Sequence, residues 1–321
     1  MNRKIDIPYV EDAEMRRTLE KSMTGRLQYT LMNDFLAKYS LQNDLYALRG
    51  LLAALLRLEL SEITDIEILN PVTPGKAITD KDCILDVRLE LNHSRIINIE
   101  IQSRYQEFWP ERSITYLCRN FDHLTEGQSY RDIKPCVQIG ILRNGLFRKT
   151  DPRYTGEFYD EYELLSTSHH TRYSSKFAIK VLSLNHLEAA GENEKNDPNG
   201  LYFWAKLFRA KSWEELKMTA EDNPHMKSFI GTVRKMTAEE EILEACEARR
   251  RYSNEIATYE EEVKAAAAER DRMTEERDRM TEERDRVTEE RDQLARERDR
   301  AMEDVRKMQA EIEALKRRLE K

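Results

Sequence analysis

Two carboxylates on neighbouring predicted strands are the residues of this chain best placed to do chemistry. Residues 83–91 and 95–102 (CILDVRLEL and RIINIEIQ) alternate polar and apolar side chains with the period of half-buried strands, and only NHS separates them. If NHS forms a hairpin turn, Asp86 lies directly across from Glu100, and Gln102 follows on the same face. Opposed like charges destabilise a strand pair, and a divalent cation bound by carboxylate oxygens is the usual way to neutralise them. The pattern therefore predicts a metal site in which Asp86 and Glu100 bind Mg²⁺ and Gln102 orients a water or a phosphate oxygen.

The same alternation has a simpler interpretation. The polar side chains of an amphipathic hairpin often face solvent, and on the strand pattern alone this interpretation is the stronger one. If a metal does bind, the backbone carbonyl of Ile101 can add an oxygen ligand beside Asp86 and Glu100. The metal would lower the pKa of a bound water and stabilise negative charge on a phosphate, which is the chemistry of phosphodiester hydrolysis.

Predicted helices and strands of an α/β domain surround this hairpin. Residues 23–60 are expected to be helical, and Asn33 or Asp34 can cap the first helix. After Gln102, the segment FWPERSITYLCRNFDHL has apolar residues at helical spacing and Pro110 in its first turn. The strand-like segments ITDIEILNP and KPCVQIGILR stand before the hairpin and after that helix, and the second is largely apolar, as in a sheet centre. The order helix, strand, hairpin, helix, strand predicts an α/β core with a mixed sheet.

From about residue 238 the chain has the composition of a single long helix. Residues 238–321 contain no Pro or Gly, and a seven-residue repeat, ERDRMTE, starts at Glu269. Apolar residues recur every seven positions: Met273, Met280, Val287, Leu294, Ala301, Met308 and Leu315. With these at heptad position d, the a positions near both ends are apolar, whereas those in the middle are Arg270, Arg277, Arg284, Arg291 and Arg298.

This heptad pattern favours a coiled coil whose ends are apolar at positions a and d and whose middle is apolar at position d alone. Glu/Arg pairs four residues apart, such as Glu275 and Arg279, leave a solitary charged helix open as the alternative. In both cases the tail is a spacer or an oligomerisation element, and we expect it to join two copies of the chain in a homodimer.

Composition limits the classes of function. The net charge of −8 argues against indiscriminate nucleic-acid binding, but residues 101–150 carry 8 basic and 5 acidic side chains, which would attract a phosphate backbone beside the carboxylates. The chain has no apolar targeting segment at its N-terminus and no apolar run of membrane length. Its four cysteines are scattered, without a CxxC pair, as in a reduced protein. We therefore expect a cytoplasmic location and no membrane partner.

Four blocks in order resemble a known family: LMNDFLAKYSLQNDLYALRGLLAALL, ITDIEILNP, DKDCILDVRLELNHSRIINIEIQ and FWPERSITYLCRNFDHLTEGQSYRDIKPCVQIGIL. They resemble the PD-(D/E)XK nuclease family transposases, also called the Rpn family of recombination-promoting nucleases. The resemblance spans roughly residues 28–190 and continues more weakly to about residue 260. It implies a restriction-endonuclease-like core in residues 1–190, followed by a helical extension over 191–237 and the long helix over 238–321.

The resemblance also implies Mg²⁺- or Mn²⁺-dependent cleavage of DNA. Asp86 matches the metal-binding Asp of the family, and Glu100 matches the acid of its (D/E)xK element. Gln102 stands where the wider superfamily has Lys, so the charge that faces the scissile phosphate must come from another group. Asp34 matches an acidic position that can complete the metal site, although a helix cap is an equally good interpretation of this residue.

Three further residues are implied to bind the phosphate backbone. Lys81 precedes the strand that carries the metal-binding Asp, and Arg112 and Tyr116 lie four residues apart on one face of the following helix. A structural salt bridge and a core aromatic are equally good interpretations of Arg112 and Tyr116. The missing Lys and the net negative charge support a second class of function. In that class the chain is a catalytically inactive nuclease-fold protein, which binds DNA or acts as a scaffold and oligomerises through its tail.

Overall fold

The computed structural model describes residues 23–79, 86–122, 127 and 129–319. The chain divides into two compact units, one ending at Ser253 and one beginning at Asn254. The first unit is called the nuclease-like unit below, and the second is called the tail unit.

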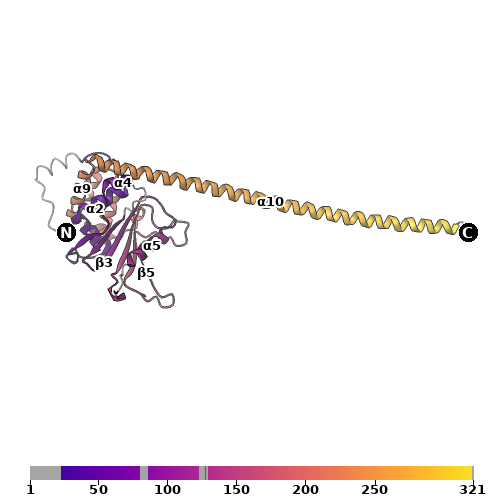
Figure 1. Ribbon diagram of the computed structural model, residues 1–321, viewed down its shortest axis with the longest axis horizontal. Coiled ribbons are helices and arrows are strands. Elements are labelled where there is room, and N and C mark those ends of the chain that lie inside the picture. The colour runs from indigo at the N-terminus through magenta and orange to yellow at the C-terminus, as the bar shows by residue number, and fades with distance from the viewer. Residues whose placement is uncertain (1–22, 80–85, 123–126, 128, 320–321) are drawn as a thin grey trace. The chain divides into compact units, whose positions relative to one another are not determined.

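A six-stranded mixed sheet forms the centre of the nuclease-like unit in the described part of the chain (Figure 1). Its strands are β1 (Ile66–Ile68), β2 (Val87–Leu91), β3 (Arg95–Gln102), β4 (Cys136–Leu142), β5 (Tyr159–Glu163) and β6 (Phe177–Ser183). The order is β1-β2-β3-β4-β6-β5; β3, β4 and β6 run parallel, and the other pairs are antiparallel. The predicted α/β fold with a mixed sheet is therefore confirmed.

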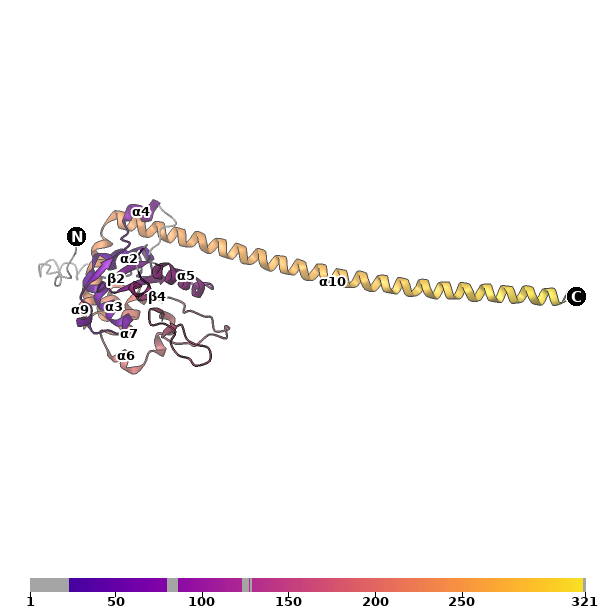
Figure 2. The ribbon, with the colours of Figure 1, turned by 60° about the horizontal axis from the view of Figure 1, so that its bottom comes forward.

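The described residues also form α-helices. They are α2 (Asp34–Asn43), α3 (Leu45–Leu56), α4 (Pro74–Thr79), α5 (Trp109–Phe121), α6 (Glu192–Asn196), α7 (Leu201–Arg209), α8 (Trp213–Thr219), α9 (Pro224–Met236) and α10 (Glu240–Leu319), with short 3₁₀ turns η1 (Leu60–Glu62), η2 (Tyr130–Asp132) and η3 (Leu184–Ala189). Helices α2, α3, α7 and α9 pack together, and their apolar side chains form one core with the face of the sheet that carries Val87, Ile99 and Ile139 (Figure 2). Helix α5 packs against β4 and β6.

The hairpin between β2 and β3 has the predicted register. Val87 pairs with Ile99 and Leu91 with Arg95, so the intervening residues make the turn. Asn92 adopts a left-handed conformation there, and its side-chain oxygen accepts hydrogen bonds from two backbone N–H groups of the preceding loop. Continuing this register by one pair places Asp86 across from Glu100.

Close packing under α5 depends on a glycine. Glu100 pairs with Gly140 on β4, and the ring of Trp109, the first residue of α5, lies over that glycine. A Cβ atom at Gly140 would come 2.3 Å from Cζ2 of Trp109. The absence of a side chain therefore lets the indole ring reach the face of the sheet that carries the carboxylates.

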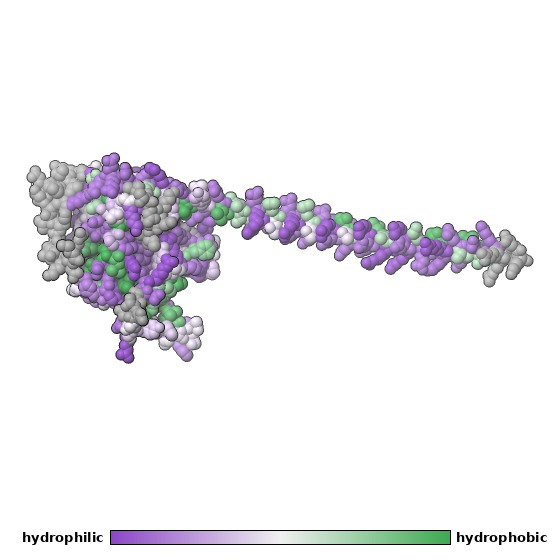
Figure 3. Space-filling model, viewed as in Figure 1, coloured by the Kyte–Doolittle hydropathy of each residue, from purple (hydrophilic) through white to green (hydrophobic). Residues whose placement is uncertain are grey.

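The tail unit is the continuation of α10 beyond Ser253. Its heptad d residues from Met273 to Met308 are exposed; 66% of Met273 and 55% of Val287 are accessible to solvent. Figure 3 shows this helix as mainly hydrophilic, with hydrophobic residues recurring along it. The unit therefore presents a repeated apolar seam that stays unburied in a single copy, and the coiled coil remains a prediction.

Candidate active site

The two predicted carboxylates lie side by side and are buried. Asp86 directly precedes β2 and Glu100 lies near the end of β3, with only 7% and 3% of their surfaces exposed. Asn98 donates a hydrogen bond from Nδ2 to Oδ2 of Asp86 (3.0 Å), and Trp109 donates one from Nε1 to Oε2 of Glu100 (3.2 Å). The interpretation of these residues as a solvent-facing polar surface is therefore wrong.

Arg112 brings a positive charge to this pair. Its Nη2 lies 3.1 Å from Oε1 of Glu100, as an ion pair, and its Nη1 donates a hydrogen bond to Oε1 of Gln106 (3.2 Å). The guanidinium also lies 5.2 Å from the centre of the Tyr116 ring. Both residues lie on α5, as the spacing of four predicted, and the structure brings them to the site through Glu100.

The buried environment changes the acidity of both carboxyl groups. Burial raises the pKa of Glu100 from its ordinary 4.5 to about 7; the charge of Arg112 opposes this rise, and that of Asp86 adds to it. Burial also raises the pKa of Asp86, against the opposing effects of the Asn98 hydrogen bond and of the charges on Arg112 and Lys38. The positive side chains nearby thus do not fully offset the cost of two buried negative charges.

These groups fit a hard divalent cation. Oε1 of Glu100 is buried and accepts no hydrogen bond of good geometry, although Arg112 is near it. Carboxylate oxygens are the ligands that Mg²⁺ and Mn²⁺ prefer, and a second positive charge here would favour the ionised form of both acids. Ile101 follows Glu100 on β3, and the role of its backbone carbonyl as a ligand stays a prediction.

Gln102 is the last residue of β3 and is half-buried. It pairs with Leu142 at the end of the parallel strand β4, and its backbone carbonyl accepts a hydrogen bond from the N–H of Arg143 (3.0 Å). The residue therefore lies on the same face as Glu100, one step closer to the edge of the sheet, where the loops that follow both strands begin.

Asp34 forms an ion pair with a basic residue from a distant part of the sequence. Its Oδ2 lies 3.1 Å from Nη2 of Arg249, near the start of α10, and the cap of α2 is Asn33, whose side chain accepts a hydrogen bond from the N–H of Leu36. Among the described residues, no group of three or more His, Cys, Asp or Glu side chains is arranged to hold a metal. Besides burial, the charge of Asp34 helps to raise the pKa of Asp86, so these two acids are near each other, and the role of Asp34 as a metal ligand stays a prediction. The predicted phosphate ligand Lys81 lies outside the described residues.

Sequence reasoning missed three polar residues of this site. Lys38 lies one turn after Asp34 on α2, is 1% exposed, and lowers the pKa of Asp86 by its charge. Asn98, besides its bond to Asp86, donates to Oε1 of Gln138 on β4 (2.9 Å), and both amides are buried. Asn98 could have been found, because it lies two residues before Glu100 on the same strand face. The spacing of apolar residues along α2 does not indicate that Lys38 is buried.

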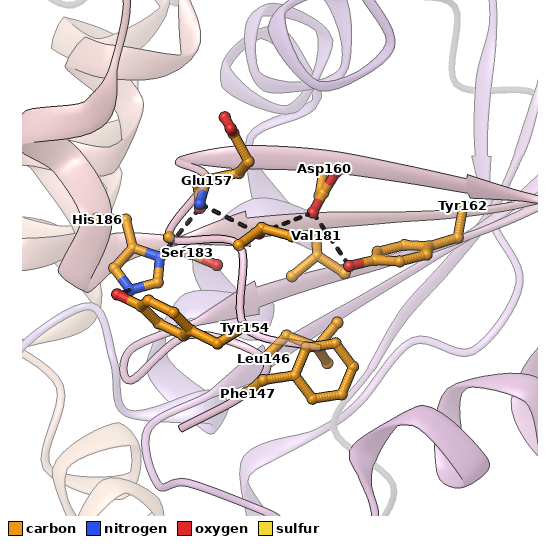
Figure 4. A pocket seen from close by; sticks show the side chains of 11 residues that line it. Leu146, Phe147, Tyr154, Glu157, Asp160, Tyr162, Val181, Ser183 and His186 are labelled. Carbon is orange, nitrogen blue, oxygen red and sulfur yellow. Dashed lines mark hydrogen bonds between the residues drawn. The ribbon is translucent and has the colours of Figure 1, made fainter. Parts of the chain in front are cut away.

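A hollow in the same unit is lined by other residues than the carboxylate pair (Figure 4). Tyr154 and His186 hydrogen-bond to each other there (3.3 Å), and Nδ1 of His186 lies 3.0 Å from the carbonyl of Glu157. Tyr162 donates to Asp160 (3.1 Å). Because these polar groups satisfy one another, we interpret the hollow as structural.

The mixed sheet, with a buried acidic pair beside an arginine from the next helix, defines an α/β domain of the nuclease type. A family model described as "PD-(D/E)XK nuclease family transposase" matches residues 31–262, and the chain belongs to this family. The resemblance inferred from the sequence is therefore confirmed. Neither the curated proteins nor the solved structures give a significant match.

Membership of this family supports a function of the nuclease or transposase type, with DNA as the substrate that the family implies. Nucleases of this kind generally depend on a divalent metal. Within the described ranges, no helix combines the length and the hydropathy that a membrane crossing needs.

Proposed function

We propose that this protein is a metal-dependent DNA endonuclease that hydrolyses phosphodiester bonds, with Mg²⁺ or Mn²⁺ as its cofactor. The observation that carries the proposal is the buried pair Asp86 and Glu100, whose negative charge is not fully compensated by the surrounding chain. A chain that only needed a stable sheet would replace such a pair by apolar residues, because buried charges are costly.

Each residue of the site has a distinct role in this proposal. Asp86 and Glu100 would hold the ion through carboxylate oxygens, and Asn98 and Trp109 would keep those carboxylates oriented through their hydrogen bonds. The ion supplies a water of lowered pKa and stabilises charge on the phosphate. Gln102 would orient the attacking water or a phosphate oxygen at the edge of the sheet.

Arg112 would supply the positive charge that Gln102 cannot. Its guanidinium is already near Glu100, and stacking on Tyr116 limits its motion. A guanidinium can bind a phosphate oxygen by two parallel hydrogen bonds, and so it suits the scissile group. Lys81 is proposed as a second phosphate ligand, and Asp34 as an acid that modulates the site by its charge.

The tail unit is proposed to join two copies of the chain. Its exposed d residues would be buried in a dimeric coiled coil, in which each copy carries one nuclease-like unit. Two sites in one assembly would suit cleavage of both DNA strands. The cytoplasmic location expected from the sequence is part of the same proposal.

Plasmid cleavage with added Mg²⁺ or Mn²⁺ tests the enzyme. We expect cleavage by the wild type and none by Asp86→Ala or Glu100→Ala, whereas the exposed-acid control Glu221→Ala should match the wild type. Circular dichroism of each variant checks that the fold persists. Cleavage without metal, or equal cleavage by the site variants, would contradict the proposal.

A catalytically inactive scaffold is the second candidate. One observation favours it: Arg112 already pairs with Glu100, in a site that lacks the Lys at position 102. Calorimetric titration with Mg²⁺ separates the two, because the enzyme should bind the ion saturably and lose that binding in Asp86→Asn. Binding that Asp86→Asn leaves unchanged would favour the scaffold.

A further inference from the structure

Two loops begin at the end of the sheet beside Gln102. Strands β3 and β4 are parallel and end together, with Gln102 opposite Leu142, so residues 103–108 and 143–153 leave the sheet side by side. The N–H of Arg143 donates to the carbonyl of Gln102 (3.0 Å), which fixes the start of the second loop beside the proposed catalytic glutamine.

Side chains join these loops further out. The guanidinium of Arg148 lies 4.5 Å from the centre of the Tyr105 ring, and that of Arg153 lies 4.3 Å from the centre of the Phe147 ring. The hydrogen-bonded carboxylate of Asp151 raises the pKa of Arg153, and the charges of Glu111 on α5 and of Tyr105 add to this rise, so both groups are near. We call Tyr105, Phe108 and residues 143–153 the rim. Gln106, next to Tyr105, accepts a hydrogen bond from Arg112, and Arg112 forms the ion pair with Glu100. Two side chains therefore connect the rim to Glu100.

The rim carries more positive than negative charge. Residues 143–153 contain four exposed basic side chains: Arg143, Arg148, Lys149 and Arg153. Asp151 is the one acidic residue of this segment and forms an ion pair with Arg153 (2.8 Å). Residues 143–153 therefore carry three more positive charges than negative ones. The nearby Glu107 and Glu111 reduce this excess; Arg104 offsets one of them, whereas Arg112 is already paired with Glu100. A local basic surface in a chain of net charge −8 is suited to a polyanion.

An exposed aromatic ring stands at the same edge. Phe108 precedes the buried Trp109 and is 73% exposed. An exposed phenyl ring offers a flat apolar surface, and such rings stack on unpaired bases in proteins that bind single-stranded nucleic acids.

We propose that the rim binds the phosphate backbone of DNA and that Phe108 stacks on an unpaired base, so that the preferred substrate has a single-stranded segment at the cleavage site. This inference deepens the proposed nuclease function and rests on it for the identity of the ligand. Arg148 and Lys149 contact phosphates, the cation–π contact with Tyr105 orients Arg148, and Phe108 selects frayed, gapped or overhanging DNA over a blunt duplex.

Binding to labelled oligonucleotides, measured by fluorescence anisotropy on the full chain in EDTA, tests the rim without any cleavage. The double variant Arg148→Ala/Lys149→Ala should bind about tenfold more weakly and reduce the slope of log K against log salt by roughly 1 to 2. Phe108→Ala should weaken binding to a single strand or an overhang by about tenfold and leave blunt-duplex binding unchanged.

Matched controls carry the same changes elsewhere. Arg209→Ala/Lys227→Ala removes two exposed charges outside the rim, and Tyr130→Ala removes a ring that is 84% exposed. Both should bind as the wild type does. The proposal is overturned if the rim variants bind like these controls, if Phe108→Ala affects blunt duplex equally, or if the wild type prefers RNA of the same sequence to DNA.

Failure of the rim and failure of the enzyme give different results. If the wild type binds DNA through the rim but never cleaves it with Mg²⁺ or Mn²⁺, the binding surface stands and the nuclease function falls. If the wild type cleaves DNA while the rim variants keep full affinity and the wild-type salt slope, the nuclease function stands and the rim falls.

Discussion

The nuclease-like unit and the tail unit use the same charged residue types in opposite ways. In the first, Glu100 is 3% exposed beside the half-buried Arg112. In the second, the repeated pair of Arg284 and Asp285 has side chains that are 74% and 63% exposed. The distances within the two pairs are equal at 3.1 Å, so burial is the difference between them.

Burial decides what such a pair can do. An exposed ion pair contributes at most about 1 kcal/mol to stability, because water screens it. In a buried pair, the attraction between the two charges does not fully offset the free energy lost when they are removed from water. The pKa of the acid is therefore shifted, and the acid attracts further positive charge. Chemistry is therefore expected in the nuclease-like unit, and the tail unit is expected to set association and spacing.

The largest effect should separate the two units by activity. In Asp86→Asn, cleavage should fall by about 1000-fold or more, since a metal contributes several kcal/mol to the transition state and one ligand charge is lost. The same isosteric change in the tail, Asp285→Asn, should leave the rate unchanged. Plasmid cleavage under identical metal concentrations measures both, and a comparable loss in the two variants would break the distinction between the units.

Dense packing around the site predicts a large effect on stability. Gly140→Ala would place a methyl group 2.3 Å from the buried ring of Trp109, which would have to move away from Glu100, and we expect a loss of about 3 kcal/mol. Gly231→Ala in α9 is the matched control, because no heavy atom apart from the backbone of its own helix lies within 4 Å of the added Cβ; it should stabilise by up to about 1 kcal/mol. Urea unfolding of both variants tests this, and equal midpoints would contradict it.

How much of this arrangement the sequence could predict depends on the range of the interactions. The hairpin register followed from the two-residue alternation and the short turn at Asn92, and α5 followed from apolar spacing after Pro110. These are local patterns. The pair of Asp34 with Arg249 joins residues 215 positions apart, and the burial of Lys38 depends on how α2 packs on the sheet. No periodic pattern in the sequence predicts such contacts, so the prediction that Asp34 is a metal ligand rested on the family resemblance alone.

Titration should show the buried acid in the metal-free protein. Because the pKa of Glu100 is raised from 4.5 to about 7, the folded state holds a proton that the unfolded state releases. The contribution of Glu100 to the free energy of unfolding is largest below pH 4.5, declines as the pH rises from 4.5 to about 7, and is constant above that. The total loss is about 3 kcal/mol. Urea unfolding in EDTA across the window measures the decline.

The control for this titration is Glu100→Gln, which should remove that part of the pH dependence. Added Mg²⁺ should reduce the loss in the wild type, because a bound cation favours the ionised carboxylate. A wild-type decline that Glu100→Gln retains in full would show that other groups cause it.

The smallest effect concerns the tail, where one substitution distinguishes a coiled coil from a solitary helix. Arg284 stands at heptad position a and Arg286 at position c of the same turn. If two tails pack along the a/d seam, Arg284→Leu should stabilise the dimer by about 1 kcal/mol through buried apolar surface, whereas Arg286→Leu should change it little because position c faces solvent. Thermal unfolding followed by circular dichroism, with analytical ultracentrifugation for the oligomeric state, measures both. Because the ion pairs of Arg284 and its neighbours are exposed, their loss should cost less than the seam gains. Equal behaviour of the two variants in a monomeric chain would instead support the solitary helix, in which positions a and c are equivalent.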